Sequence, residues 1–85
     1  MAQVIIYSTT VCPYCVRAKM LLEKKGANFE EINLTKNPER REEMLAKTGG
    51  KRTVPQIFIG DKYVGGCDDL YELELDGELE KLLAG

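Results

Sequence analysis

The chain has 85 residues, 44% of them hydrophobic and 31% charged, a composition typical of one globular domain with a single core. The net charge of -2 argues against nucleic acid as a partner, because phosphate binding needs a basic face. No apolar run approaches the ~20 residues of a membrane span, and Met1-Ala2-Gln3-Val4 shows no export signal. We therefore expect residues 1–85 to form one cytoplasmic domain without a membrane partner.

Hydrophobic periodicity and turn residues predict alternating strands and helices. In chain order these are a strand over residues 3–8, a helix over 13–25, a strand around 29–34, a helix over 38–48, strands over 56–59 and 62–64, a helix from 67, and a final turn over 79–83 beyond Gly77. Pro13 and Pro38 stand where helices favour proline, and Asn37 is expected to cap the second helix. The order predicts an α/β sandwich with a mixed four-stranded sheet flanked by three helices (βαβαββα), its first two strands parallel.

Cys12 and Cys15 flank Pro13-Tyr14 at the expected start of the first helix. The unpaired N–H groups and the positive end of the helix dipole favour a thiolate there, so the pKa of Cys12 should lie below that of a free cysteine. Cys15, one turn further along, is placed to displace a mixed disulfide and close an intramolecular bridge. This pair predicts a thiol-disulfide oxidoreductase, with Cys12 as the nucleophile and Cys15 as the resolving thiol.

Two other roles for the cysteines are less favoured. A structural disulfide fits poorly with three cysteines, an odd number, in a chain with no other feature of a disulfide-stapled secreted domain. A zinc site would need four nitrogen or sulfur ligands, yet Cys67 is the one further thiol and the chain has no histidine. We therefore expect no metal.

Two further segments are candidates for substrate binding because they occur in the same chain as the thiol pair. Pro55 directly precedes a strand, and a cis bond there would turn the Val54 backbone towards the peptide group of a thiol substrate, although proline at a strand start is also an ordinary structural feature. Residues 65–69 open a helix whose N–H groups can bind a carboxylate, while Asp68 or Asp69 accepts from an amine. A plain glycine turn with acidic capping is the simpler explanation of this second segment.

Three motifs together resemble one family. Cys12-Pro13-Tyr14-Cys15, Thr53-Val54-Pro55 and Gly65-Gly66-Cys67-Asp68-Asp69, in this order and spacing, are similar to those of the dithiol glutaredoxins, most of all their small bacterial members. Thioredoxins usually carry Gly-Pro between the cysteines, and the monothiol relatives that carry iron-sulfur clusters lack the second cysteine. The resemblance covers nearly the whole chain.

The resemblance implies a thioredoxin fold, a monomer, glutathione as the reducing co-substrate, and reduction of protein disulfides and glutathione mixed disulfides. Ribonucleotide reductase is a protein substrate at the level of the family. Carried over by position, Cys12 and Cys15 are the catalytic pair, Pro55 is the cis-proline, and the Val54 backbone pairs with the cysteinyl part of glutathione. The implied glutathione-binding residues are Tyr14, Thr53, Val54, Pro55, Gly66, Cys67 and Asp68, the last two at the γ-glutamyl end.

The chain departs from the family at one place. Members commonly have a lysine about three residues before the first cysteine, and here that region reads Ser8-Thr9-Thr10-Val11. Lys51 and Arg52 are the expected substitutes for its charge. Cys67 is expected to be a buried residue whose backbone binds, rather than a third redox thiol.

Two alternative functions stay open. In the first, Cys12 thiolates of two protomers and two glutathiones hold an iron-sulfur cluster; the stiff Pro13-Tyr14 loop and competition from Cys15 disfavour it. In the second, the protein is a redoxin that is reduced by thioredoxin reductase and has lost glutathione binding.

Overall fold

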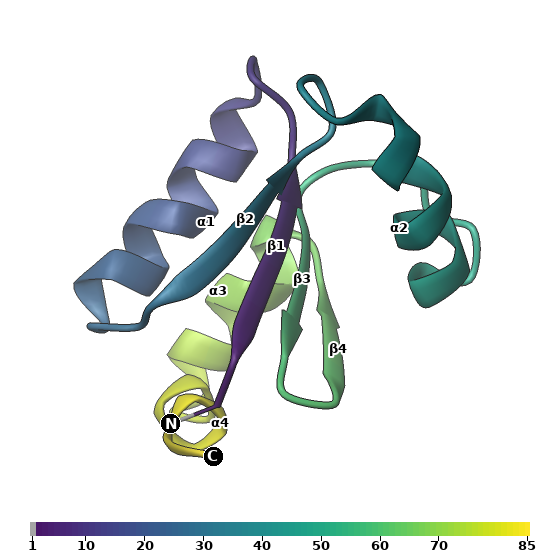
Figure 1. Ribbon diagram of the computed structural model, residues 1–85. Helices are drawn as coiled ribbons and strands as arrows, with labels where there is room; N and C mark the ends of the chain where they lie inside the picture. The colour runs from purple at the N-terminus through teal and green to yellow at the C-terminus, as the bar shows by residue number, and fades with distance from the viewer. Residues whose placement is uncertain (1) are drawn as a thin grey trace.

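The structure is a computed structural model and describes residues 2–85. Figure 1 shows its elements, which in chain order are β1 (Val4–Ser8), α1 (Pro13–Lys24), β2 (Phe29–Asn33), the 3-10 helix η1 (Pro38–Arg40), α2 (Arg41–Thr48), β3 (Gln56–Ile59), β4 (Lys62–Gly65), α3 (Cys67–Leu75) and α4 (Leu79–Ala84). The predicted strands and the first helix are confirmed, with ends that differ by at most one residue.

The four strands form one mixed sheet in the order β2-β1-β3-β4. The crossover through α1 brings β2 parallel to β1, with Val4 opposite Phe29. β3 runs antiparallel to β1 and is joined to β4 as a hairpin. The turn of this hairpin contains Gly60 with φ +58°, a backbone conformation that glycine adopts readily.

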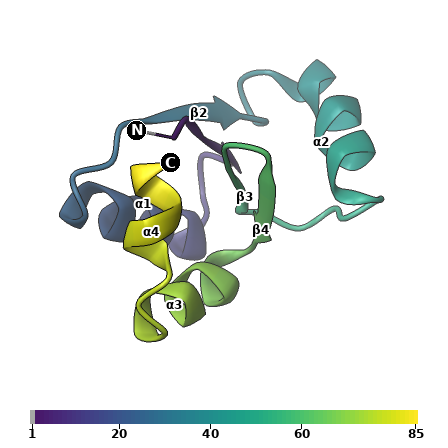
Figure 2. The same ribbon diagram turned by 90° about the horizontal axis from the view of Figure 1, so that it is seen from below.

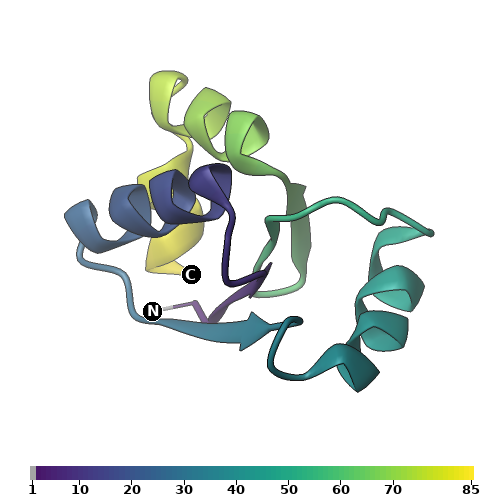
Figure 3. The same ribbon diagram turned by 90° about the horizontal axis from the view of Figure 1, so that it is seen from above.

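The sheet is covered unequally on its two faces. Figures 2 and 3 show α1, α3 and α4 on one side of the sheet and α2 on the other. Because neighbouring strand residues point to opposite faces, Val4 and Ile6 enter the larger core beneath α1, α3 and α4, whereas Tyr7 enters a smaller one beneath α2. Met44 of α2 is buried in that smaller core.

Three details differ from the sequence prediction. The second helix begins as η1, and the Asn37 side chain does not cap it but donates to the Asn33 carbonyl oxygen at 3.2 Å. The predicted final turn is a short helix, α4, because the chain resumes helical geometry after Gly77 and buries Leu79 and Leu83. Residues 2–85 therefore contain four α-helices where three were predicted.

The strand register gathers the motifs at one end of the sheet. Tyr7, near the end of β1, pairs with Gln56 at the start of β3, so the loop that leads to Cys12 meets the segment that ends at Pro55. Gly65, the last residue of β4, pairs with Ile57, which places the start of α3 beside them. Within residues 2–85, no helix is long and apolar enough to cross a membrane.

Candidate active site

Cys12 and Cys15 form a disulfide at the N-terminus of α1. Cys12 is the N-cap residue, with extended backbone (φ -155°, ψ 97°), and Pro13 is the first helical residue, as predicted. The Cys15 backbone N–H donates to Cys12 Sγ at 3.0 Å. This N–H group and the helix dipole both favour negative charge on the Cys12 sulfur once the disulfide is reduced.

The two thiols differ in their access to solvent. Cys12 is half-buried, whereas Cys15 is only 1% exposed and packs on the inner face of α1. A disulfide outside the protein can therefore reach the Cys12 sulfur, and it cannot reach that of Cys15. Their Cα atoms lie 5.1 Å apart, so the pair closes and opens with little movement of the backbone.

The Val54–Pro55 peptide bond is cis, as the resemblance implied. Pro55 is buried at the start of β3, and the Val54 carbonyl oxygen lies 3.9 Å from Cys12 Sγ. A ligand bound to the Cys12 sulfur would therefore lie directly against the backbone of Val54.

A groove of about 190 Å³ opens next to this contact. Its walls contain all the residues that the resemblance assigned to glutathione binding, namely Tyr14, Thr53, Val54, Pro55, Gly66, Cys67 and Asp68, and they add Asp69. The structure thus brings together three segments that are far apart in the sequence.

The far wall of the groove is the first turn of α3. Gly66 is the N-cap residue, and its backbone N–H donates to Asp69 Oδ2 at 2.9 Å, which is the half of a capping box that glycine can make. The residue pattern left either Asp68 or Asp69 as the acceptor for an amine, and the resemblance selected Asp68. Because Asp69 is engaged in the cap, Asp68 is the exposed carboxylate left for a ligand. The N–H groups of Cys67 and Asp68 have no acceptor within the helix, as at any helix start.

Cys67 lies in the core and not on the surface. It is 4% exposed, and burial raises the pKa of its thiol, with Arg17 opposing and Asp68 reinforcing the effect. A protonated, buried thiol is a poor nucleophile at neutral pH. The expectation that Cys67 is a buried residue is confirmed.

The cations near the groove differ from those expected. Lys51 and Arg52 are exposed and do not line it. The Arg17 guanidinium instead lies 5.8 Å from the ring centroid of Tyr14, a groove residue, and 5.4 Å from that of Tyr71. The spacing of three residues between Tyr14 and Arg17 was the signal in the sequence for this contact.

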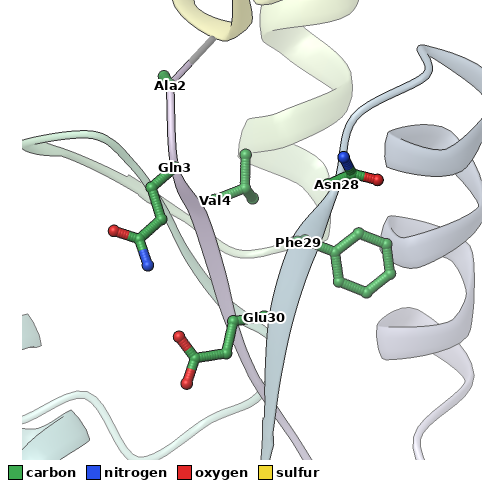
Figure 4. A pocket seen from close by; sticks show the side chains of 6 residues that line it. All are labelled: Ala2, Gln3, Val4, Asn28, Phe29 and Glu30. Atoms are coloured by element: carbon green, nitrogen blue, oxygen red, sulfur yellow. The ribbon is translucent and has the colours of Figure 1, made fainter.

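A larger hollow of about 370 Å³ lies at the start of β1, far along the strand from the thiols. Figure 4 shows its lining residues, Ala2, Gln3, Val4, Asn28, Phe29 and Glu30. The Gln3 and Glu30 side chains extend to one side of β1 and β2, and the Phe29 ring points to the other. Over residues 2–85, no group of three His, Cys, Asp or Glu side chains is arranged to hold a metal ion. The thiol pair lies next to the smaller groove and far from this hollow.

The structure has a redox-capable thiol pair at a helix N-terminus, and this pair faces a cis-proline at the end of a four-stranded mixed sheet. These features define a thiol-disulfide oxidoreductase of the thioredoxin fold. Comparison with known proteins gives the family. Residues 4–64 match the family model described as Glutaredoxin.

Relatives match over nearly the full length. The chain is 55% identical over 84 residues to the glutaredoxin of Pseudomonas aeruginosa, covering 99% of each chain. It is 53% identical over 83 residues to glutaredoxin 3 of Escherichia coli, covering 98% of this chain and 99% of that protein. The crystal structure of a buckwheat glutaredoxin-glutathione complex superimposes with a TM-score of 0.86 at 37% identity, covering 98% of this chain and 77% of that one. The chain belongs to the glutaredoxin family, and the predicted family and fold are confirmed.

Proposed function

We propose that this protein is a glutathione-dependent oxidoreductase that reduces protein disulfides and glutathione mixed disulfides, working as a monomer in the cytoplasm. The observation that carries the proposal is the groove, whose walls unite Val54, the open N-terminus of α3 and Tyr14 of α1. Cys12 Sγ lies 3.9 Å from the carbonyl oxygen of Val54 in this wall. The buckwheat relative forms a complex with glutathione, which supports the same ligand here.

The groove offers one complementary group for each part of the cysteinyl and γ-glutamyl portions of glutathione. The Val54 backbone pairs with the peptide groups on either side of the ligand sulfur. The N–H groups of Cys67 and Asp68 receive the γ-glutamyl carboxylate at the positive end of α3, and the Asp68 carboxylate receives the amine. Tyr14 and Thr53 enclose the ligand from the two sides of the groove.

The reaction begins when the Cys12 thiolate attacks one sulfur of the substrate disulfide. A bond forms between this sulfur and Cys12 Sγ, the substrate S–S bond breaks, and the departing thiolate takes a proton from water. Where the substrate is glutathionylated, Cys12 takes the glutathione, and a second glutathione thiolate releases it as oxidised glutathione. Where the substrate is a protein disulfide, the Cys15 thiol loses its proton and attacks Cys12 Sγ. The Cys12–Cys15 bond forms, the bond between Cys12 Sγ and the substrate sulfur breaks, and the substrate leaves as a thiolate that takes a proton from water. Two glutathiones then reduce the Cys12–Cys15 bond and leave as oxidised glutathione.

The choice of reductant is the test of this proposal. Turnover of a glutathionylated peptide should be supported by glutathione with glutathione reductase, and not by thioredoxin reductase alone. The Cys12→Ser variant should be inactive with either system. Turnover that needs thioredoxin reductase and ignores glutathione would refute the proposal.

The role of the second thiol has its own test. Cys15→Ser should keep most of the activity on glutathionylated substrates, because that route needs only Cys12, and should lose the reduction of protein disulfides. Loss of both activities in a folded variant would contradict the assignment of Cys15 as the resolving thiol.

A further inference from the structure

A chain of hydrogen bonds joins the β3–β4 hairpin to the groove. Gln56, the first residue of β3, is 3% exposed. Its Nε2 donates to the Thr53 carbonyl oxygen at 2.9 Å and lies 3.1 Å from Thr53 Oγ1. On the other side, the Tyr63 hydroxyl donates to Gln56 Oε1 at 2.5 Å. The buried amide therefore has partners for both its oxygen and its nitrogen.

The donors and acceptors of these hydrogen bonds follow from the chemistry of the groups. The Thr53 carbonyl oxygen can only accept, so the nitrogen of the Gln56 amide must face it, and the amide oxygen must face Tyr63. The Tyr63 hydroxyl must then donate. It is protonated at neutral pH, as tyrosine ordinarily is. Burial, reinforced by Asp69, raises the pKa of Tyr63 further above its ordinary value of 10.0. The Tyr63 ring is stacked on Phe58, with centroids 5.0 Å apart, so the donor is held by the sheet.

The anchored group is next to the reactive centre. Thr53 precedes Val54, whose carbonyl oxygen lies 3.9 Å from Cys12 Sγ, and both residues line the groove. The loop before them is exposed at Lys51, Arg52 and Thr53. Holding the Thr53 carbonyl therefore limits how far the adjoining Val54 peptide can turn, and that peptide must stay aligned to pair with the backbone of a ligand.

We propose that Gln56, oriented by Tyr63, is a positioning residue that aligns the Val54 backbone for thiols embedded in a peptide. The inference rests on the proposed function, because it takes a ligand with peptide groups on both sides of its sulfur. It adds a basis for selectivity. The reaction of Cys12 with a disulfide that carries peptide groups should depend on Gln56, whereas the reaction with a disulfide that lacks them should not.

The test compares two disulfides on the fully reduced protein. Oxidised glutathione carries peptide groups, and hydroxyethyl disulfide carries none. For each, the second-order rate constant of oxidation of Cys12 is measured. In Gln56→Met, which keeps the side-chain length and loses its hydrogen bonds, the rate constant with oxidised glutathione should fall about tenfold, as expected for a lost hydrogen-bond anchor. The rate constant with hydroxyethyl disulfide should stay within about twofold of that of the wild type, since the wild-type reaction makes no use of the Val54 backbone.

Two further variants make the outcome decisive. Tyr63→Phe removes only the hydroxyl, so it should lower the same rate constant in the same direction and by less, even if Gln56→Met folds poorly. Gln3→Met, an identical replacement at the opposite end of β1, should leave both rate constants unchanged.

If the rate constants with the two disulfides fall equally, or if neither falls, the inference is overturned. A merely structural role of Gln56 would affect the reactions with both disulfides alike. A wild-type protein with no preference for oxidised glutathione would remove the proposed function and this inference together. A wild-type preference that Gln56→Met and Tyr63→Phe both retain would remove this inference alone.

Discussion

Replacing Gly65 with alanine perturbs the far wall of the groove through the backbone. Gly65 has φ +113°, a conformation that costs a residue with a side chain roughly 1–3 kcal/mol. An added Cβ would also lie 2.9 Å from Asp69 Cγ and closer still to its carboxylate. Asp69 would then have to turn away from the Gly66 N–H group, and the loss of this cap costs about 1 kcal/mol more. The sum is about 2–4 kcal/mol of unfolding free energy.

Urea denaturation of the reduced proteins measures this difference, with Gly49→Ala as the matched control. Gly49 has φ +72° and no atom within 4 Å of an added Cβ, so it should show only the backbone strain, about 1 kcal/mol. Asp69→Ala should show only the loss of the cap. If Gly65→Ala loses no more free energy than Gly49→Ala, the clash with Asp69 has no energetic weight and the reasoning fails.

Two further predictions concern titration. The hydrogen bond from Tyr7, followed by Arg40, holds the pKa of Glu43 below its ordinary value of 4.5. The folded state therefore gains stability from the ionised Glu43 carboxylate at pH values above 4.5 and loses it as the pH falls through the lowered pKa. Acid should then lower the unfolding free energy of the wild type more than that of Glu43→Gln in denaturation curves. Equal losses of unfolding free energy in the two proteins would contradict this prediction. In the reduced protein at neutral pH, iodoacetamide should modify Cys12 rapidly and buried Cys67 slowly, as peptide mass spectrometry will show; comparable rates would contradict the burial of Cys67.

Local patterns explain what the sequence could predict. The four strands are apolar runs between turn residues, and α1 has proline at its first position and Gly26 after its end, so these signals lie within a few neighbouring residues. The N-cap position of Cys12 could be predicted in the same way, because an N-cap is recognised from the residues next to it in the sequence. The family motifs then assigned the groove residues, which the structure finds on one groove.

The rest depends on contacts between distant segments. Asp68 and Asp69 are adjacent and chemically alike; the family resemblance selected Asp68, and the capping geometry gives the physical reason. In the sequence, Gln56 looks like an ordinary strand residue. Its role depends on the hydrogen-bond partners of its side chain, which are Thr53 and, in the next strand, Tyr63. A short helix such as α4 has too few residues for a periodic pattern, and its burial against the core determines its geometry.

The central claim is that Cys12 takes glutathione through the groove formed by Val54, Pro55 and the start of α3. Reduced Cys15→Ser protein treated with oxidised glutathione and analysed by peptide mass spectrometry tests it most directly, because the variant cannot close the intramolecular disulfide. The account predicts one glutathionyl group per chain, attached to Cys12. Attachment to Cys67, or an unmodified protein, would contradict it.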